Sequence, residues 1–335
     1  MDFDPTEEQQ AARDLAARIF GDLATHERLA AAGTGTDAEL WKALCAAGLV
    51  EAVEETGLLG LVLLAEEQGR TTAQVPFTAS AVYGLLAVAR HGTEEQRARL
   101  LPGLRAGTTV VTGAFPQSPQ SPRAPWVPWL RDATHVLVPD EGKTLHLVPV
   151  TGDAVEPVEL TAPWSAGRAV LDPASGERIG GPGPEAYEDV LAAARIAFAG
   201  LQAGVCAGSL ARAVAYTSVR EQFGRPLSSN QAVQLRAADA YMDTESIRVT
   251  AYEAAWRYDQ ELSVAEHALT AAWWASEAGK RVVHAGQHLH GGLGADLDHP
   301  VHRHFLWGRQ LDAYLGCGTE LLAELGDLLA QGETR

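Results

Sequence analysis

Residues 220–227 read REQFGRPL and join two long helical segments, and residues 287–294 read QHLHGGLG at the end of a third. Each stretch has a structural explanation. Arg220 would complete a helix, where a cation suits the dipole, and Gly291 and Gly292 would stop one. Each stretch is also compatible with a role in ligand binding. A planar guanidinium can grip a phosphate, and glycines let a ligand approach the main chain. The residues alone leave both interpretations open.

The helices around these stretches are predicted from composition and capping. Apolar and Ala-rich periodicity predicts helices over 190–219 and 231–258. Ser263 to Glu266 has the form of a capping box that opens a helix running toward His290. Further helical stretches are expected over 300–315 and 320–330. Residues 185–335 are therefore predicted to form a long-helix bundle.

The amino-terminal region, residues 1–106, is predicted to be a helical domain. The sequences TEEQ at 6–9 and TEEQ at 93–96 are capping boxes. Helices are also expected from Asp37 to Gly48, over 58–68 and over 80–90.

The pattern changes over residues 107–184, which are predicted to form a small, reduced middle β domain. Five prolines punctuate residues 116–128 and exclude a helix there. Short strands are expected at 108–112, 135–138, 145–150, 155–160 and 169–171. The stretch GERIGGPGP (176–184) is predicted to be a linker. The chain is thus mainly α, in the order α, β, α.

Composition excludes several classes of protein. The 335 residues are 46% hydrophobic and 21% charged, which is ordinary for a globular chain. Acidic residues outnumber basic ones by 43 to 26, giving −17, so neither nucleic acid nor an anionic membrane is an expected partner. The longest apolar runs suggest no membrane span, and no signal segment is evident. The three cysteines, Cys45, Cys206 and Cys317, suit a cytoplasmic protein with free thiols.

The two motifs together, RxQFGxPLxxxQ and Q-x-x-x-GG-x-G, resemble the carboxyl-terminal domain of the acyl-CoA dehydrogenase family. The opening MDFDPTEEQQAARD and the stretch GTEEQRARLLPGL (92–104) resemble its amino-terminal part. The resemblance implies that family's fold. It also implies FAD, bound across a subunit interface and held mainly by the neighbouring subunit.

Carried over residue by residue, the resemblance implies a set of FAD contacts. Arg220 would pair with the pyrophosphate, and Phe223 would pack on the adenine side. Gln231, Gln287 and Gly291 would line the path of the dinucleotide, with His290 beside it.

Two departures from the family pattern concern catalysis. The loop and strand that hold the isoalloxazine ring have no counterpart after Val111. The family removes an α-proton with a carboxylate, and Leu315 stands where that Glu is expected. Glu188 and Asp189 are the alternative, a displaced base, although carboxylates at a helix start are common. No catalytic residue is therefore expected on this chain.

A metal site is not expected. His284 and His288 have i,i+4 spacing, but no H-E-x-x-H motif or nearby cysteine accompanies them. The tryptophans at 256, 273, 274 and 307 are expected to pack in the bundle and at subunit contacts.

The resemblance is strongest to the short, degenerate subunit of actinobacterial α2β2 acyl-CoA dehydrogenases, many of which act on CoA thioesters of steroid side chains. It implies an acyl-CoA substrate and a longer homologue as partner. Two alternatives remain: a catalytically silent structural homologue without FAD, and a self-sufficient homodimer with Asp189 or Glu188 as base.

Overall fold

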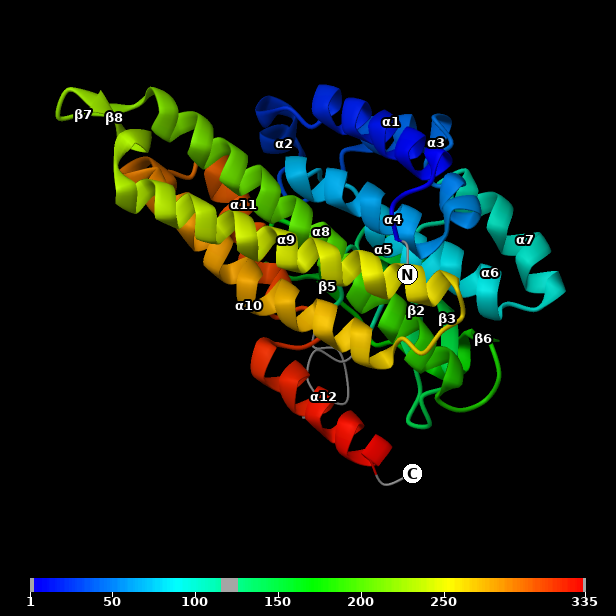
Figure 1. Ribbon diagram of the computed structural model, residues 1–335. Coiled ribbons are helices and arrows are strands. Elements are labelled where there is room, and N and C mark those ends of the chain that lie inside the picture. Colours follow the sequence, from blue (N-terminus) through cyan, green and yellow to red (C-terminus); the bar gives the residue numbers. More distant parts are fainter. Residues whose placement is uncertain (1–2, 116–125, 334–335) are drawn as a thin grey trace.

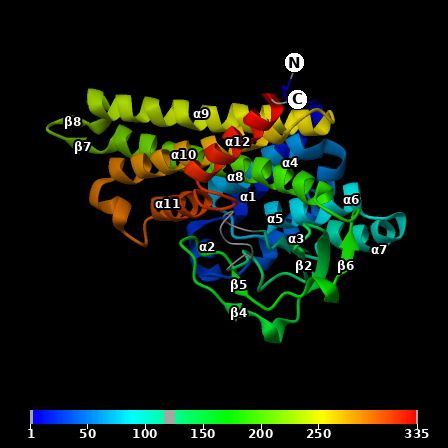
Figure 2. The same cartoon turned by 90° about the horizontal axis from the view of Figure 1, so that it is seen from below.

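The computed structural model describes residues 3–115 and 126–333. It is mainly helical and follows the predicted order, with a helical amino-terminal region, a small β lobe and a bundle of long helices (Figure 1). In Figure 2 the β lobe lies beside the amino-terminal helices, away from the hairpin that ends the bundle. The predicted fold class is confirmed.

The amino-terminal region holds seven α-helices and one π-helical turn within the described residues. These are α1 (Glu7–Leu23), α2 (His26–Ala32), α3 (Ala38–Ala46), α4 (Ala52–Thr71), α5 (Phe77–Ser80), η1 (Ala81–Leu86), α6 (Ala87–His91) and α7 (Glu94–Arg105). Both predicted capping boxes form. Thr6 Oγ1 accepts from the Gln9 amide at 3.2 Å, and Thr93 Oγ1 accepts from the Gln96 amide at 3.2 Å. Helix α2 was not predicted.

Helix α4 bends at Gly57. The φ of 72° at this residue is positive, and glycine adopts such angles without steric cost. The amides of Leu58 and Leu59 lose their helical acceptors at this bend. The Asp259 carboxylate, at the end of α9 (Gln231–Asp259), accepts from them at 2.7 and 2.9 Å. Asp259 thereby caps a buried helix 200 residues away in the sequence.

The β lobe is built on a four-stranded sheet in the order β1-β2-β3-β6. Its strands are β1 (Val111–Gly113), β2 (His135–Pro139), β3 (Leu145–Pro149) and β6 (Glu177–Ile179). Strand β1 runs parallel to β2, and the other pairs are antiparallel. A separate ribbon pairs β4 (Glu156–Pro157) with β5 (Gly167–Arg168).

Two strand predictions and one linker prediction in the β lobe need correction. The strand expected at 169–171 is wrong, because the chain pairs at 167–168 instead. The strand expected over 155–160 covers only Glu156–Pro157. The predicted linker at 176–184 contains β6, whose Ile179 is fully buried against the sheet.

The bundle consists of α8 (Glu185–Val219), α9, α10 (Ala265–Leu289), α11 (Pro300–Leu311) and α12 (Gly318–Glu333). The capping box expected at Ser263 does not form. Val264 is the N-cap residue and makes no side-chain cap. Helix α12 lies across α10 at the edge of the bundle (Figure 1).

Helices α4 and α8 pack with their backbones in direct approach. A Cβ at Gly204 would lie 1.9 Å from the Glu66 carbonyl oxygen, and one at Gly69 would lie 2.1 Å from that of Leu201. Only glycine fits at such crossings. Beside this contact the fully buried Glu66 carboxylate accepts from Arg248 at 2.6 Å and from the Tyr252 hydroxyl at 2.8 Å. Burial raises the pKa of Glu66, but these partners outweigh it and lower the pKa overall.

Helix α8 is long and apolar enough to cross a bilayer by length and composition, contrary to what the short apolar runs suggested. However, 83% of its apolar window is buried inside the protein, as is typical of a core helix. Length and composition alone are weak evidence for a membrane span.

Candidate functional site

The first motif forms a hairpin at the far end of the bundle. It consists of β7 (Glu221–Gln222) and β8 (Arg225–Pro226) and projects beyond α8 and α9 (Figure 1). Arg220 follows the last residue of α8, where its amide donates to the Tyr216 carbonyl at 2.9 Å. The turn places Phe223 at φ 53° and Gly224 at φ 77°, and the Phe223 side chain is 100% exposed. An apolar ring held this far out is available to a ligand or a second chain.

The second motif forms the turn after α10. Gly291 has φ 60°, and a Cβ there would meet nothing within 4 Å. The 3-10 turn η5 (Gly291–Ala295) follows, and the Gln287 side chain donates to the Gly294 carbonyl at 3.1 Å. Gln287 therefore fixes the shape of the turn, while Gly291 presents open main chain to the outside.

An aromatic contact brings the two motifs together. The Tyr216 ring, one turn before Arg220, stacks on the His290 ring, with centroids 4.9 Å apart and planes at 20°. His290 is buried and donates from Nδ1 to the Gly286 carbonyl at 2.7 Å. His299, the N-cap residue of α11, lies 5.0 Å from His290 between ring centroids. These ring contacts thus connect the end of α8, the end of α10 and the start of α11.

Gln231, in contrast, is placed apart from this contact. It is exposed in the first turn of α9, whose cap is the Asn230 side chain accepting from the Ala232 amide at 2.9 Å. Within residues 3–115 and 126–333, no hydrogen bond joins Gln231 to the second motif.

Arg212 also lies at this end of the bundle, although it was not among the residues predicted from the two motifs. Burial lowers the pKa of its guanidinium, and no carboxylate of the described residues offsets that loss. Its charge acts on His299, whose pKa is lowered by burial, by His290 and by Arg212. The available signal was the i, i+4 spacing of Arg212 and Tyr216, which places both on one face of α8, near its end at the C-cap residue Arg220.

This arrangement fits an anionic dinucleotide. Arg212 and Arg220 form no ion pair with any carboxylate that the structure describes, although the chain is strongly acidic. Unpaired guanidiniums, an open glycine turn and an exposed ring match a pyrophosphate and an adenine. The residues of the bundle end are therefore compatible with the outer half of FAD.

The candidate bases do not fit proton abstraction. One oxygen of Asp189 lies 2.7 Å from His91 Nε2, 2.7 Å from the Tyr258 hydroxyl and 3.2 Å from Arg90 Nε. Burial raises the pKa of Asp189, but His91, Tyr258 and Arg90 outweigh it and hold the pKa below its ordinary value. A general base for a thioester α-proton needs the opposite shift. Glu188 is exposed to solvent.

Leu315 lies in a rigid aromatic junction between the three regions. It is buried at φ 64°, next to Tyr314. The Tyr314 hydroxyl lies 2.9 Å from that of Tyr83, and its ring contacts Phe198 with centroids 4.7 Å apart. Trp164 packs edge-on against Trp307 at 5.4 Å in the same junction. These rings surround Tyr314, the neighbour of Leu315, which stands at the position where the Glu is expected.

The histidines serve packing and hydrogen bonding. His284 packs edge-on against Phe305, and Arg236 donates to His288 Nδ1 at 2.7 Å. His304 is buried with Nε2 donating to the Arg70 carbonyl, and burial lowers its pKa to about 4. In the described part of the chain, no three His, Cys, Asp or Glu side chains converge as metal ligands would.

The segment 116–125, where the flavin-ring loop was expected to be missing, lies outside the described residues.

The fold is an α–β–α chain with a long-helix bundle, and comparison with known proteins identifies its family. The family models for the amino-terminal and carboxyl-terminal domains of acyl-CoA dehydrogenase match residues 6–108 and 181–324. This chain belongs to the acyl-CoA dehydrogenase family.

Similar proteins include acyl-CoA dehydrogenases FadE27 and FadE28 of Mycobacterium tuberculosis. FadE27 is 32% identical over 99% of both chains, and FadE28 is 28% identical over 97% of this chain and 98% of its own. Among solved structures, a chain of the Tcur3481-Tcur3483 steroid ACAD G363A variant has a TM-score of 0.90 and 38% identity, covering 98% of this chain and 99% of its own. A chain of the ChsE4-ChsE5 complex from Mycobacterium tuberculosis has a TM-score of 0.89 and 30% identity, with the same coverage.

Proposed function

We propose that this chain is the non-catalytic subunit of a heteromeric, FAD-dependent acyl-CoA dehydrogenase. In this proposal the complex desaturates an acyl-CoA thioester between the α- and β-carbons. A longer homologous subunit holds the flavin ring and the base, and this chain completes the FAD site with the end of its bundle. The assembly proposed is α2β2.

The contact between Tyr216 and His290 is the observation that carries this proposal. It fixes the arginine motif and the glycine motif against each other at an exposed end of the bundle. Arg212 and Arg220 beside it are exposed and have no carboxylate partner among the described residues, as a site for an external anion requires. The silent-scaffold alternative is therefore less well supported.

The residues have defined tasks in the proposed complex. Bound FAD supplies the hydride acceptor for the dehydrogenation. Arg220 and Arg212 would balance the charge of its pyrophosphate, and Gly291 would offer main chain to the same group. Phe223 would pack against the adenine. His290 holds the turn and the Tyr216 ring in place through Gly286.

Proton abstraction is assigned to the partner. Leu315 carries no ionisable group and is buried inside this chain. Asp189 is an ion-pair residue with a lowered pKa. The self-sufficient homodimer is for this reason the weaker alternative.

The relatives support both the partner and the substrate class. The two similar structures are those of the Tcur3481-Tcur3483 steroid ACAD and of the ChsE4-ChsE5 complex, and each combines two different proteins. We infer that the acyl group here is a bulky one of the steroid side-chain type.

The test is co-expression with a longer acyl-CoA dehydrogenase homologue from a neighbouring open reading frame, followed by gel filtration and flavin absorbance. Two FAD per four chains are expected, with desaturation of a steroid side-chain CoA thioester. Arg220→Ala should weaken the affinity of the complex for FAD about ten- to a hundred-fold and so lower its flavin content. Arg220→Lys should recover part of that affinity. A yellow, active homodimer of this chain alone would overturn the proposal, and a flavin-free complex would favour the silent scaffold.

A further inference from the structure

The ring of His299 contacts that of His290 at the end of the bundle, and the proposed function gives His299 no task. The two ring centroids lie 5.0 Å apart with planes at 59°. His290 is the buried residue that ends α10, and His299 is the N-cap residue of α11. The Tyr216 ring of α8 stacks on the same His290. Two titratable rings are therefore in contact beside both sequence motifs.

Hydrogen bonds define the protonation state of His299. Its Nδ1 lies 3.3 Å from the Val301 amide, which can only donate, so this nitrogen carries no proton. A proton there would face the Val301 N–H and remove the cap of α11. His290 is held in the other form, because its Nδ1 faces the Gly286 carbonyl and must itself donate. The hydrogen bonds of the folded chain thus favour a neutral His299.

The charged and titratable groups around His299 come from several elements and are mostly basic. They are His290 after α10, Arg212 of α8, His26 at the start of α2 and the carboxylate of Asp296 after η5. On α11 itself, His302 and Arg303 follow within about one turn. Burial and the basic neighbours hold the pKa of His299 below its ordinary value of about 6.5, and Asp296 offsets only part of this effect.

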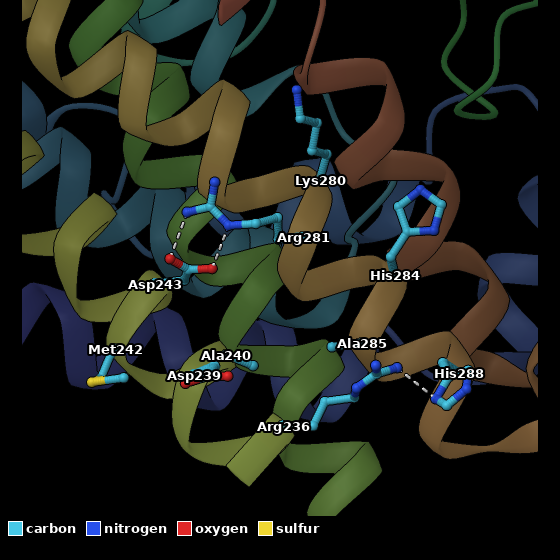
Figure 3. Close-up of a pocket in the computed structure, with 10 residues that line it drawn as sticks. All are labelled: Arg236, Asp239, Ala240, Met242, Asp243, Lys280, Arg281, His284, Ala285 and His288. Atoms are coloured by element: carbon cyan, nitrogen blue, oxygen red, sulfur yellow. Dashed lines mark hydrogen bonds and ion pairs between the residues drawn. The ribbon is translucent and has the colours of Figure 1, made fainter. Parts of the chain in front are cut away.

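His288 is a histidine of the same bundle end with a different environment. It faces α9, where Arg236 donates to its Nδ1 at 2.7 Å (Figure 3). In the part of the chain that the structure describes, no ring contact joins His288 to His290 or His299. His288 therefore resembles His299 in accepting a hydrogen bond at Nδ1, but it lies outside the His290 contact. These properties make it a matched control.

We propose that FAD binding at the bundle end is coupled to the uptake of a proton, and that His299 is the residue that takes it. A pyrophosphate beside Arg212 offsets the positive charge that disfavours a proton on His299, so the imidazolium form becomes favourable when the anion is present. His299 is a positioning residue in this inference, because it acts through the cap of α11 and through the His290 ring. The inference rests on the proposed function, because it takes the anion from there. It adds a dependence of flavin retention on pH.

The direction of this dependence follows from the pKa of His299 in the two states. Its pKa is low in the free chain and a bound anion raises it, so the bound state carries more protons than the free state. Affinity for FAD is therefore highest at a pH below the pKa of the free chain. It falls as pH rises through the interval between the two pKa values and is constant above that interval. One proton limits the fall to about tenfold per pH unit.

The test measures proton uptake directly on the complex with the longer homologue, after its flavin has been removed. Calorimetric titration with FAD in two buffers of different ionisation enthalpy gives the number of protons bound. Between pH 8 and pH 6 the Kd for FAD should fall about three- to tenfold. His299→Asn keeps a side chain that caps helices but cannot be protonated in this range. This variant should bind FAD as the wild type does at pH 8, and its affinity should not increase toward pH 6.

His288→Asn should keep both the proton uptake and the pH dependence of the wild type. Thermal melting of each variant shows whether its fold is intact. The same pH dependence in wild type and His299→Asn, or its loss in His288→Asn as well, would overturn the inference and leave the proposed function standing. If the wild-type complex binds no FAD at any pH, the proposed function fails and this inference fails with it.

Discussion

The ring of Tyr216 stacks on that of His290, with centroids 4.9 Å apart, although Tyr216 lies in α8 and His290 is the cap residue that follows α10. Tyr216 stands one turn before the arginine motif, and His290 directly precedes Gly291. The stack therefore sets the distance between the arginines proposed to bind an anion and the open glycine turn at Gly291. Its rigidity matters because charge-assisted hydrogen bonds depend on geometry.

Tyr216→Leu should loosen this arrangement. An aromatic pair contributes about 0.5–1.5 kcal/mol beyond buried area, so FAD affinity of the assembled complex should fall up to about tenfold. Tyr216→Phe keeps the ring and should retain flavin. Bound FAD per complex after gel filtration measures the effect. Equal flavin content in the Leu and Phe variants would show that the stack plays no part in the site.

Arg212→Gln tests the residue that sequence reasoning missed. Arg212 is exposed and has no carboxylate partner among the described residues, so it is available to an external anion. Arg212→Gln should therefore leave the thermal stability of the chain alone unchanged and lower flavin retention of the complex. Arg178→Gln is the matched control and should change neither. A variant that keeps full flavin would remove Arg212 from the site.

Asp189→Asn separates a structural carboxylate from a catalytic one. Its pKa is lowered in the folded chain, so its contribution to stability is present above the unfolded Asp pKa of about 3.9 and is lost as pH falls through the folded pKa. The variant should lose about 1–3 kcal/mol at pH 7 and converge with the wild type in acid. Denaturant unfolding at several pH values measures this. Turnover per bound flavin should stay unchanged, and its loss from a stable, flavin-loaded complex would identify Asp189 as the base.

Local sequence predicted those parts of the fold that local contacts determine. The TEEQ boxes at 6–9 and 93–96 formed because each needs only four residues. The box at Ser263 did not form because the helix begins at Ala265, one residue later than the box requires, with Val264 as its N-cap residue. Strand β5 was misplaced because its partner residues are Glu156 and Pro157, and the apolar run at 169–171 does not encode that register.

The same distinction applies to the site. Arg220, His290 and Gly291 were found because their motifs are contiguous in sequence, and the structure brings them to one surface. The role of Asp189 depends on His91 and Tyr258, which lie 98 and 69 residues away in the chain. Gln287 was expected along the dinucleotide path, and the structure shows its amide holding the glycine turn through Gly294. Whether these residues contact FAD stays a prediction.

Gly204→Ala should be among the most damaging single changes in the chain. Its Cβ would lie 1.9 Å from the Glu66 carbonyl oxygen, so α4 and α8 must separate around the buried ion cluster. Overpacking of this kind costs about 1–3 kcal/mol or more. Gly326→Ala is the control, because that helical position is open and alanine gains up to about 1 kcal/mol there. Thermal melting should move the two variants in opposite directions, and a neutral Gly204→Ala would contradict the close approach of the helices.

Leu315→Glu asks whether this chain could be turned into a second catalytic subunit. The new carboxyl group would be buried beside the Tyr314 ring, where desolvation raises its pKa and penalises the charged form. Because the folded pKa lies above the unfolded one, the penalty grows as pH rises and vanishes in acid. Leu315→Glu should therefore be less stable than its uncharged isostere Leu315→Gln at pH 7, and the two should converge toward pH 4. Neither variant should change turnover per bound flavin, because position 315 is buried inside this chain and the base is assigned to the partner subunit. Turnover gained by Leu315→Glu and not by Leu315→Gln would show that the junction admits substrate, and the base would then belong to both subunits.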